Sequence, residues 1–83
     1  MFYVYVIKSE SSSKIYIGQT SDLDKRLKQH NDPNNSFSKY TKQNCGPWRL
    51  IYKEEVATRL DALKRERFLK SGIGRSFIKH IPG

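Results

Sequence analysis

The 83-residue chain is long enough for one small domain, which we expect to span residues 1–83. Its 16 lysine and arginine residues against 8 acidic residues give a net charge of +8, and this excess indicates a polyanionic partner such as nucleic acid, with a merely basic surface as the alternative. The single cysteine, Cys45, excludes an internal disulfide or a multi-cysteine zinc site and suits the reducing cytoplasm, while the longest apolar run, Phe2–Ile7, is too short to span a membrane.

The chain opens with the pattern of a β-hairpin. Residues 2–8 are aromatic and β-branched, which favours a strand, and residues 14–18 predict a second strand after a serine-rich turn. Ser21 with Asp24 three residues later matches a capping box, so a helix is expected to begin at Ser21 and to end near Asn31.

One face of this first helix carries both apolar and chemically active side chains. At about 100° per residue, Leu23 and Leu27 share that face with Arg26 and His30. The leucines are expected to enter the core. His30 has a second interpretation, as a positive charge that interacts with the C-terminal end of the helix.

A long polar stretch, residues 32–47, follows the first helix. Structureless loops of this length are usually functional or partly disordered. Phe37 and Tyr40 stand among its small polar residues together with Lys39 and Lys42.

The second half of the chain predicts a strand and two helices. The strand covers residues 48–54, Thr58 caps a helix that runs to about Lys70, and a short C-terminal helix covers residues 75–79. The expected fold class is therefore α+β, a small three-stranded antiparallel sheet flanked by helices in the order β-β-α-β-α-α.

The long second helix places an acid within an apolar arc. Ala62, Leu63 and Leu69 share that arc, Glu66 falls between them, and Arg65 lies outside it. A carboxylate in such a position is costly unless a cation or a metal ion pairs with it. An ordinary salt bridge to a nearby arginine is the structural alternative to a metal site.

The strand residues and the two helices together carry a family resemblance. Tyr3-Val4-Tyr5 and, ten residues after Tyr5, Tyr16-Ile17-Gly18 resemble the signature of the GIY-YIG nucleases. That family has an arginine ten residues after the second tyrosine, a histidine one helical turn later in many members, and a glutamate on a later helix, which Arg26, His30 and Glu66 match. Nearly the whole chain is similar to small stand-alone bacterial members of this family. Those members resemble nuclease domains that act on branched and damaged DNA.

The resemblance implies a metal-dependent endonuclease, structure-specific in some relatives and involved in DNA repair. The implied catalytic residues are Tyr5, Tyr16, Arg26, His30 and Glu66, and the implied metal ligand for one Mg²⁺ or Mn²⁺ is Glu66. The residue types suit this chemistry, because one carboxylate can hold Mg²⁺, arginine donates to two phosphate oxygens, and a tyrosine, of which Tyr16 is the better candidate, can act as general base. The residues expected to contact nucleic acid are Lys39, Tyr40, Lys42, Arg65, Lys70 and Arg75.

Alternatives remain open at this point. RNA is the alternative substrate, and the alternative functions are a nucleic-acid-binding module without cleavage and a domain that acts only with a separate DNA-targeting protein. The chain also departs from some relatives, because Gln19 stands where they have a lysine and no asparagine follows Asn44. The pattern therefore does not support a lysine acting beside Tyr16.

Overall fold

The computed structural model describes residues 1–11, 13–31 and 47–81 of the chain. Within these ranges the elements are β1 (Phe2–Ser9), β2 (Ile15–Thr20), α1 (Leu23–Asn31), β3 (Trp48–Val56), α3 (Arg59–Lys70) and α4 (Gly72–Lys79). The predicted α+β fold and its element order are confirmed. The polar stretch at 32–46, with Phe37, Lys39, Tyr40 and Lys42, lies outside the described residues.

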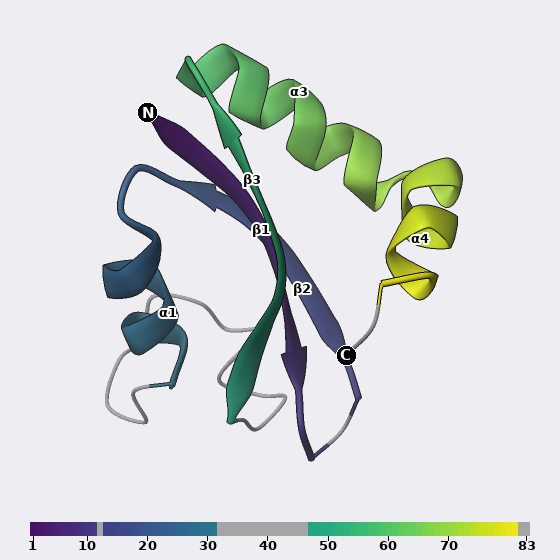
Figure 1. The fold of residues 1–83 in the computed structure, drawn as a ribbon. Coiled ribbons are helices and arrows are strands. Elements are labelled where there is room, and N and C mark those ends of the chain that lie inside the picture. Colours follow the sequence, from purple (N-terminus) through teal and green to yellow (C-terminus); the bar gives the residue numbers. More distant parts are fainter. Residues whose placement is uncertain (12, 32–46, 82–83) are drawn as a thin grey trace.

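The sheet has β1 at its centre, between β2 and β3, and both pairings are antiparallel. Helix α1 covers one face of the sheet, and α3 with α4 covers the other (Figure 1). Across β1 the register places Tyr5 opposite Gly18 on β2. On the β3 side the register shifts between Val6 and Ile7, so Ile51 is an extra residue that bends β3.

Strand β1 is buried on both faces because helices lie above and below it. Side chains of a strand alternate between faces, so Val4 and Val6 pack toward α3 and α4, whereas Tyr5 and Ile7 pack toward α1. This explains why the strand is aromatic and β-branched throughout instead of alternating between apolar and polar residues.

The helix ends correct two of the predicted boundaries. Asp22, and not Ser21, caps α1, because its Oδ1 accepts the backbone N–H of Lys25 at 3.1 Å while its own N–H donates to Thr20 Oγ1. The predicted cap at Thr58 is confirmed for α3. Helix α4 begins earlier than predicted because Ser71 ends α3 and caps α4 at once.

The packed side of α3 differs in part from the predicted arc. Ala62 and Leu69 are buried as expected, but Leu63 is 44% exposed. Arg65, expected outside the arc, is half-buried and bonds Glu54 of β3. The helix is therefore rotated so that Arg65, and not Leu63, meets the sheet.

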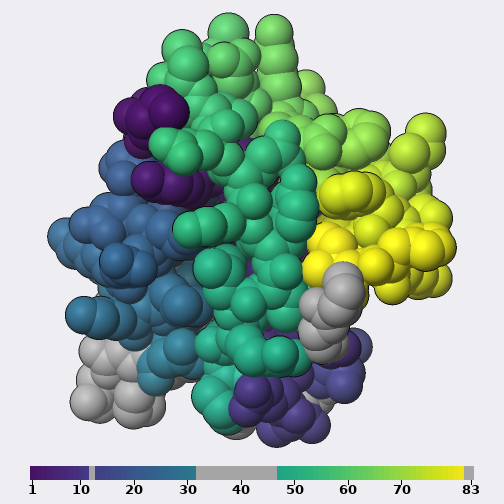
Figure 2. All heavy atoms as spheres, in the orientation of Figure 1, coloured from purple at the N-terminus to yellow at the C-terminus, as the bar shows by residue number. Residues whose placement is uncertain are grey.

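The view in Figure 2 shows how the helices flank β3. Side chains of β3 fill the middle of this face, with the blue α1 on one side and the yellow α4 on the other. Asn31 joins α1 to β3, since its Nδ2 donates to the Trp48 carbonyl and its Oδ1 accepts the Trp48 N–H. Tyr52 of β3 meets Phe77 of α4 edge to face.

No helix in the described parts of the chain is both long enough and apolar enough to cross a lipid bilayer.

Candidate active site

A tyrosine and a histidine form the buried part of the site. The Tyr5 hydroxyl on β1 lies 2.8 Å from Nε2 of His30 on α1. Both residues are buried, with 1% and 5% of their surface exposed. The predicted face of α1 is thus confirmed, because the His30 ring points at the sheet and Leu23 and Leu27 pack beside it.

Tyr16 joins this pair from β2. The Tyr16 ring lies 4.8 Å from the His30 ring and 6.4 Å from the Tyr5 ring, measured between centroids. Gly18 leaves the space that the Tyr5 hydroxyl occupies, because a Cβ at Gly18 would lie 2.6 Å from that oxygen. The glycine of the second tripeptide therefore has a steric role. The hairpin register pairs Gly18 with Tyr5, so the predicted hairpin was the available signal for this role.

Burial fixes the protonation of the Tyr5–His30 pair. Burial, and then the charge of Arg26, lowers the pKa of His30 to about 4, so its ring is neutral at pH 7. This argues against the interpretation of His30 as a charge at the end of the helix. Burial also raises the pKa of Tyr5 above its ordinary value, so we assign the Tyr5 hydroxyl as the donor and Nε2 of His30 as the acceptor.

The charges of Arg26 on α1 and of Glu66 on α3 both act on the Tyr5 hydroxyl. Arg26 on α1 is partly buried, and its positive charge lowers the pKa of Tyr5. Glu66 on α3 raises that pKa, as a negative charge near a phenol must. The structure therefore brings a cation and an acid from two helices to the two tyrosines and the histidine.

Glu66 has a partner that was not predicted. Its Oε2 lies 2.7 Å from Nζ of Lys70, one turn later on α3, and its side chain is 20% exposed. The partner is a lysine and not the arginine that was expected for an ordinary salt bridge. The spacing of four residues between an acid and a following lysine was the available signal.

Glu66 on α3 and Gln19 on β2 carry oxygen atoms of the kind that suits a divalent ion that keeps most of its water. No group of three or more His, Cys, Asp or Glu ligands occurs among the described residues, so a site here would rest on one carboxylate. Glu66 already holds a cation, the Lys70 ammonium. Oε1 of Gln19 is buried without a hydrogen-bond partner in the described parts, on the face of β2 that α3 covers. Carboxylate and amide oxygens both suit Mg²⁺.

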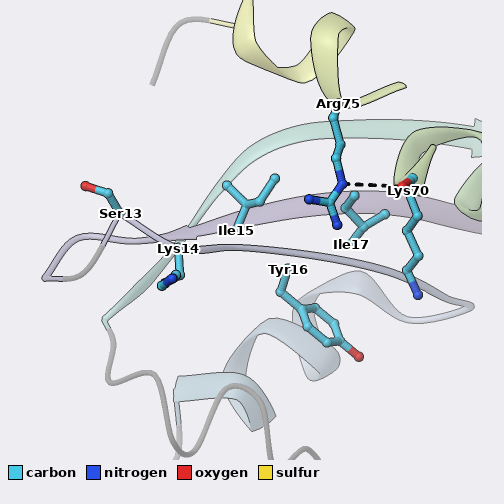
Figure 3. Close-up of a pocket in the computed structure, with 7 residues that line it drawn as sticks. All are labelled: Ser13, Lys14, Ile15, Tyr16, Ile17, Lys70 and Arg75. Carbon is cyan, nitrogen blue, oxygen red and sulfur yellow. Dashed lines mark hydrogen bonds between the residues drawn. The ribbon is translucent and has the colours of Figure 1, made fainter. Parts of the chain in front are cut away.

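A basic cleft of about 520 Å³ runs along the outer edge of β2 beside Tyr16 (Figure 3). Lys70 and Arg75, both predicted to contact nucleic acid, line it, and Lys14 is a third cation that the sequence did not single out. Lys70 thus brings a lysine close to Tyr16 from another element, although none follows Gly18 in the sequence.

Arg65, also predicted to contact nucleic acid, is not among the residues that line this cleft. Arg65 Nε donates to Glu54 Oε2 at 2.9 Å, and its guanidinium lies 4.7 Å from the Phe68 ring centroid. Its planar head is therefore engaged in joining α3 to β3. Lys39, Tyr40 and Lys42 fall outside the described ranges.

Comparisons with known proteins give one family match and several bacterial relatives. A family model described as the GIY-YIG catalytic domain matches residues 1–75. The chain is 40% identical over 70 residues to a UPF0213 protein of Clostridium perfringens, covering 84% of this chain and 71% of the relative. It is 35% identical over 79 residues to a UPF0213 protein of Staphylococcus epidermidis, covering 95% and 92%, and 40% identical over 68 residues to UPF0213 protein YazA of Bacillus subtilis, covering 82% and 65%. No solved structure matches the chain.

Proposed function

Because the chain belongs to the GIY-YIG nuclease family, we propose that it is a metal-dependent endonuclease that cuts phosphodiester bonds of DNA. The observation that carries this proposal is the convergence of two tyrosines, a neutral histidine, an arginine and a glutamate near the Tyr5 hydroxyl. Hydrolysis of a phosphodiester needs a base for water, a cation for the phosphate and help for the leaving oxygen. The site offers a residue for each of these needs. We further propose a structure-specific substrate and a role in DNA repair.

The two tyrosines take different roles in this proposal. Tyr5 is fully buried, and its raised pKa and its bond to His30 keep the hydroxyl protonated. It therefore positions the site and does not remove a proton from water. Tyr16 is only partly buried and lines the open cleft, so a water molecule on the substrate phosphate can reach it. Tyr16 is the general base in our proposal.

Arg26 is the residue for the phosphate. A guanidinium donates two parallel hydrogen bonds to phosphate oxygens, a geometry that lysine lacks. Arg26 also faces a depression of about 330 Å³ with Lys25 at the start of α1. This position supports an approach of the DNA backbone from the solvent side of α1.

Glu66 is the residue for the metal ion. One carboxylate suffices for Mg²⁺ or Mn²⁺, since such ions keep several water ligands and take others from phosphate oxygens. The chemistry that a bound ion supplies is Lewis-acid stabilisation of charge on the phosphate and on the leaving oxygen. A bound ion would share the Glu66 carboxylate with the Lys70 ammonium or compete with it, since Lys70 already pairs with Oε2.

A nucleic-acid-binding module without cleavage is the second candidate. The observation that favours it is the Glu66–Lys70 ion pair, because an acid that is already neutralised needs no metal ion. The basic cleft would bind a phosphate backbone in either case. A domain that needs a separate DNA-targeting protein remains a variant of the first proposal.

The deciding experiment compares cleavage and binding on the same protein. Purified chain is incubated with branched and linear DNA and with an RNA of the same sequence, in Mg²⁺, Mn²⁺ or EDTA. Glu66→Gln is the test variant, and Glu55→Gln is its control because Glu55 is an exposed glutamate on β3. We expect cleavage only with metal, none with Glu66→Gln, and wild-type cleavage with Glu55→Gln.

Binding and stability complete this experiment. DNA binding in EDTA should weaken steeply with salt, since lysine and arginine contacts to phosphate release counterions. An exposed i,i+4 ion pair is worth about 0.3–0.5 kcal/mol, so Glu66→Gln should lower the melting temperature by only a few degrees. Tight binding without cleavage in any metal would support the binding module. Full cleavage by Glu66→Gln would contradict the metal-ligand assignment.

A further inference from the structure

The cleft beside β2 gathers positive charge from three separate elements. Lys14 precedes β2, Lys70 ends α3 and Arg75 belongs to α4. Figure 3 shows the Tyr16 ring and the Lys70 side chain extending beyond β2 on the same side, with the Arg75 guanidinium above the strand. None of the described residues that line the cleft is acidic. Such a surface suits an anion.

The α3–α4 junction holds two of these cations in place. Arg75 Nε donates to the Lys70 carbonyl at 3.3 Å, so the two residues are joined through the backbone. Gly74 lets α4 cross closely over the end of α3, because a Cβ there would collide with the Phe68 carbonyl and with Leu69. The packing at Gly74 thus fixes where α4 begins, and the hydrogen bond to the Lys70 carbonyl directs the exposed Arg75 head toward the end of α3.

The Lys70 side chain pairs with an acid and also lines the cleft. Its ammonium pairs with Glu66 Oε2 at 2.7 Å, and the same side chain, about half exposed, lines the cleft. One ammonium cannot neutralise a carboxylate at full strength while it binds a phosphate. A ligand that takes Lys70 away leaves Glu66 with an unpaired negative charge, which favours a cation there.

We propose that the cleft formed by Lys14, Lys70 and Arg75 is a binding subsite for a backbone phosphate of the nucleic-acid strand, and that Lys70 couples this subsite to Glu66. A phosphate in the cleft draws the Lys70 ammonium from Glu66, and the carboxylate then binds a divalent ion more tightly. The proposal rests on the proposed function for the identity of the anion. Metal binding and substrate binding thereby favour each other.

The first test measures metal affinity with Mn²⁺ as the probe, by water-proton relaxation, on the full chain without nucleic acid. Lys70→Met removes the competing cation, and Lys64→Met removes the same charge from an exposed position on the same helix. We expect Lys70→Met to raise the Mn²⁺ affinity about three- to fivefold, and Lys64→Met to change it by less than half that factor. Lys70→Arg keeps the charge and should restore the wild-type value.

The second test measures binding of a fluorescent 12-base-pair duplex in EDTA at several salt concentrations. Lys70→Met and Arg75→Met should each weaken binding about three- to tenfold and reduce the salt slope by about one, with a smaller effect from Lys64→Met. Thermal melts confirm that each variant is folded. Lys70→Gln serves if Lys70→Met does not fold.

The outcomes separate this proposal from the proposed function. Equal Mn²⁺ affinities for Lys70→Met and Lys64→Met would overturn the coupling, and equal duplex affinities would overturn the phosphate subsite. Mn²⁺ binding that Glu66→Gln leaves intact would overturn both the coupling and the metal-ligand assignment. The expected affinity changes in a protein that cuts no DNA would support the coupling while the proposed endonuclease activity fails.

Discussion

The two faces of the sheet use the same central strand for different purposes. On the face that α3 and α4 cover, Val4 and Val6 meet an aliphatic cluster with Ala62, Leu69 and Ile78. On the face that α1 covers, Tyr5 and Ile7 meet Trp48, and a hydroxyl and an imidazole are bonded inside the core. Both faces are equally buried, so burial does not distinguish the site face from the structural face.

Hydrogen bonding is what distinguishes the two clusters around β1. The aliphatic cluster around Val4 and Val6 needs only a matched volume, whereas the buried hydroxyl and imidazole on the α1 side each need a hydrogen-bond partner. Tyr5 and His30 supply that partner for each other. We therefore expect substitutions that remove a polar group on the α1 face to reduce activity. Substitutions that change side-chain volume on the α3 face should instead reduce stability.

The largest expected effect is on activity alone, from the α1 face. Arg26→Ala should lower cleavage by about 10²-fold or more, a loss typical of removing one preorganised charge donor. Arg26 is only partly buried, at the edge of the face that Leu23 and Leu27 fill, so the melting temperature should change little. Lys25→Ala removes an exposed neighbouring charge and is the control. Cleavage within a few-fold of wild type would show that Arg26 does not act on the phosphate.

A methyl group added on each face should separate stability from activity. Gly74→Ala meets backbone atoms of Phe68 and Leu69, which cannot turn aside, so we expect a loss of about 1–3 kcal/mol in unfolding free energy. Cleavage per folded molecule should fall only modestly, through the displacement of the neighbouring Arg75. Gly18→Ala meets the Tyr5 hydroxyl, the end of a ring that can tilt. It should cost less stability and more activity. Denaturant melts and cleavage assays on both variants test this, and the reverse pattern would refute the division of roles.

Removal of the hydroxyl group should affect a different property in each of the two tyrosines. Tyr5→Phe removes the donor to buried His30 and should destabilise the fold by about 1 kcal/mol. Tyr16→Phe should leave the unfolding free energy nearly unchanged and remove most of the cleavage, because Tyr16 is the proposed base at the open cleft. Melting curves and single-turnover rates measure the two quantities. A Tyr16→Phe enzyme with wild-type rates would require another base.

The last expected effect appears only at acidic pH and is a pH dependence of stability through His30. Its pKa is about 4 in the fold against 6.5 ordinarily, and the groups around it are Tyr5, Tyr16 and Arg26. A lowered pKa means that the stabilising contribution is complete above about pH 6.5 and is lost as the pH falls toward 4. The difference in melting temperature between wild type and His30→Gln should therefore shrink over that range. A constant difference would contradict the assignment of a neutral, buried ring.

Local patterns were sufficient to predict most of the fold. The strands follow from uninterrupted aromatic and β-branched runs, and the buried face of α1 follows from helical spacing. The cap of α1 could not be predicted, because Asp22 caps only when the Thr20 hydroxyl fixes its backbone N–H. The exposure of Leu63 depends on how α3 is rotated, and the Arg65–Glu54 bond between distant elements sets that rotation.

The sequence indicated which residues form the candidate site, but it did not indicate which of them are in contact. The resemblance to the GIY-YIG family implied Tyr5, Tyr16, Arg26, His30 and Glu66 as site residues, and their chemical roles stay predictions. The bond between Tyr5 and His30 requires the hairpin register and the space at Gly18 together. The cleft required knowledge of how α4 crosses α3, which no local pattern carries.

In the sheet that the described residues form, β2 lies at the edge, and no strand of residues 1–11, 13–31 or 47–81 pairs with its outer side. An open edge is a template onto which a second chain can add a strand, the first step of many aggregation processes. The cations that line this edge would face the identical cations of an approaching copy, and like charges repel. The positive charge that suits a phosphate backbone thus also opposes strand addition by a second copy, and we expect variants that remove it to be more prone to self-association at low salt.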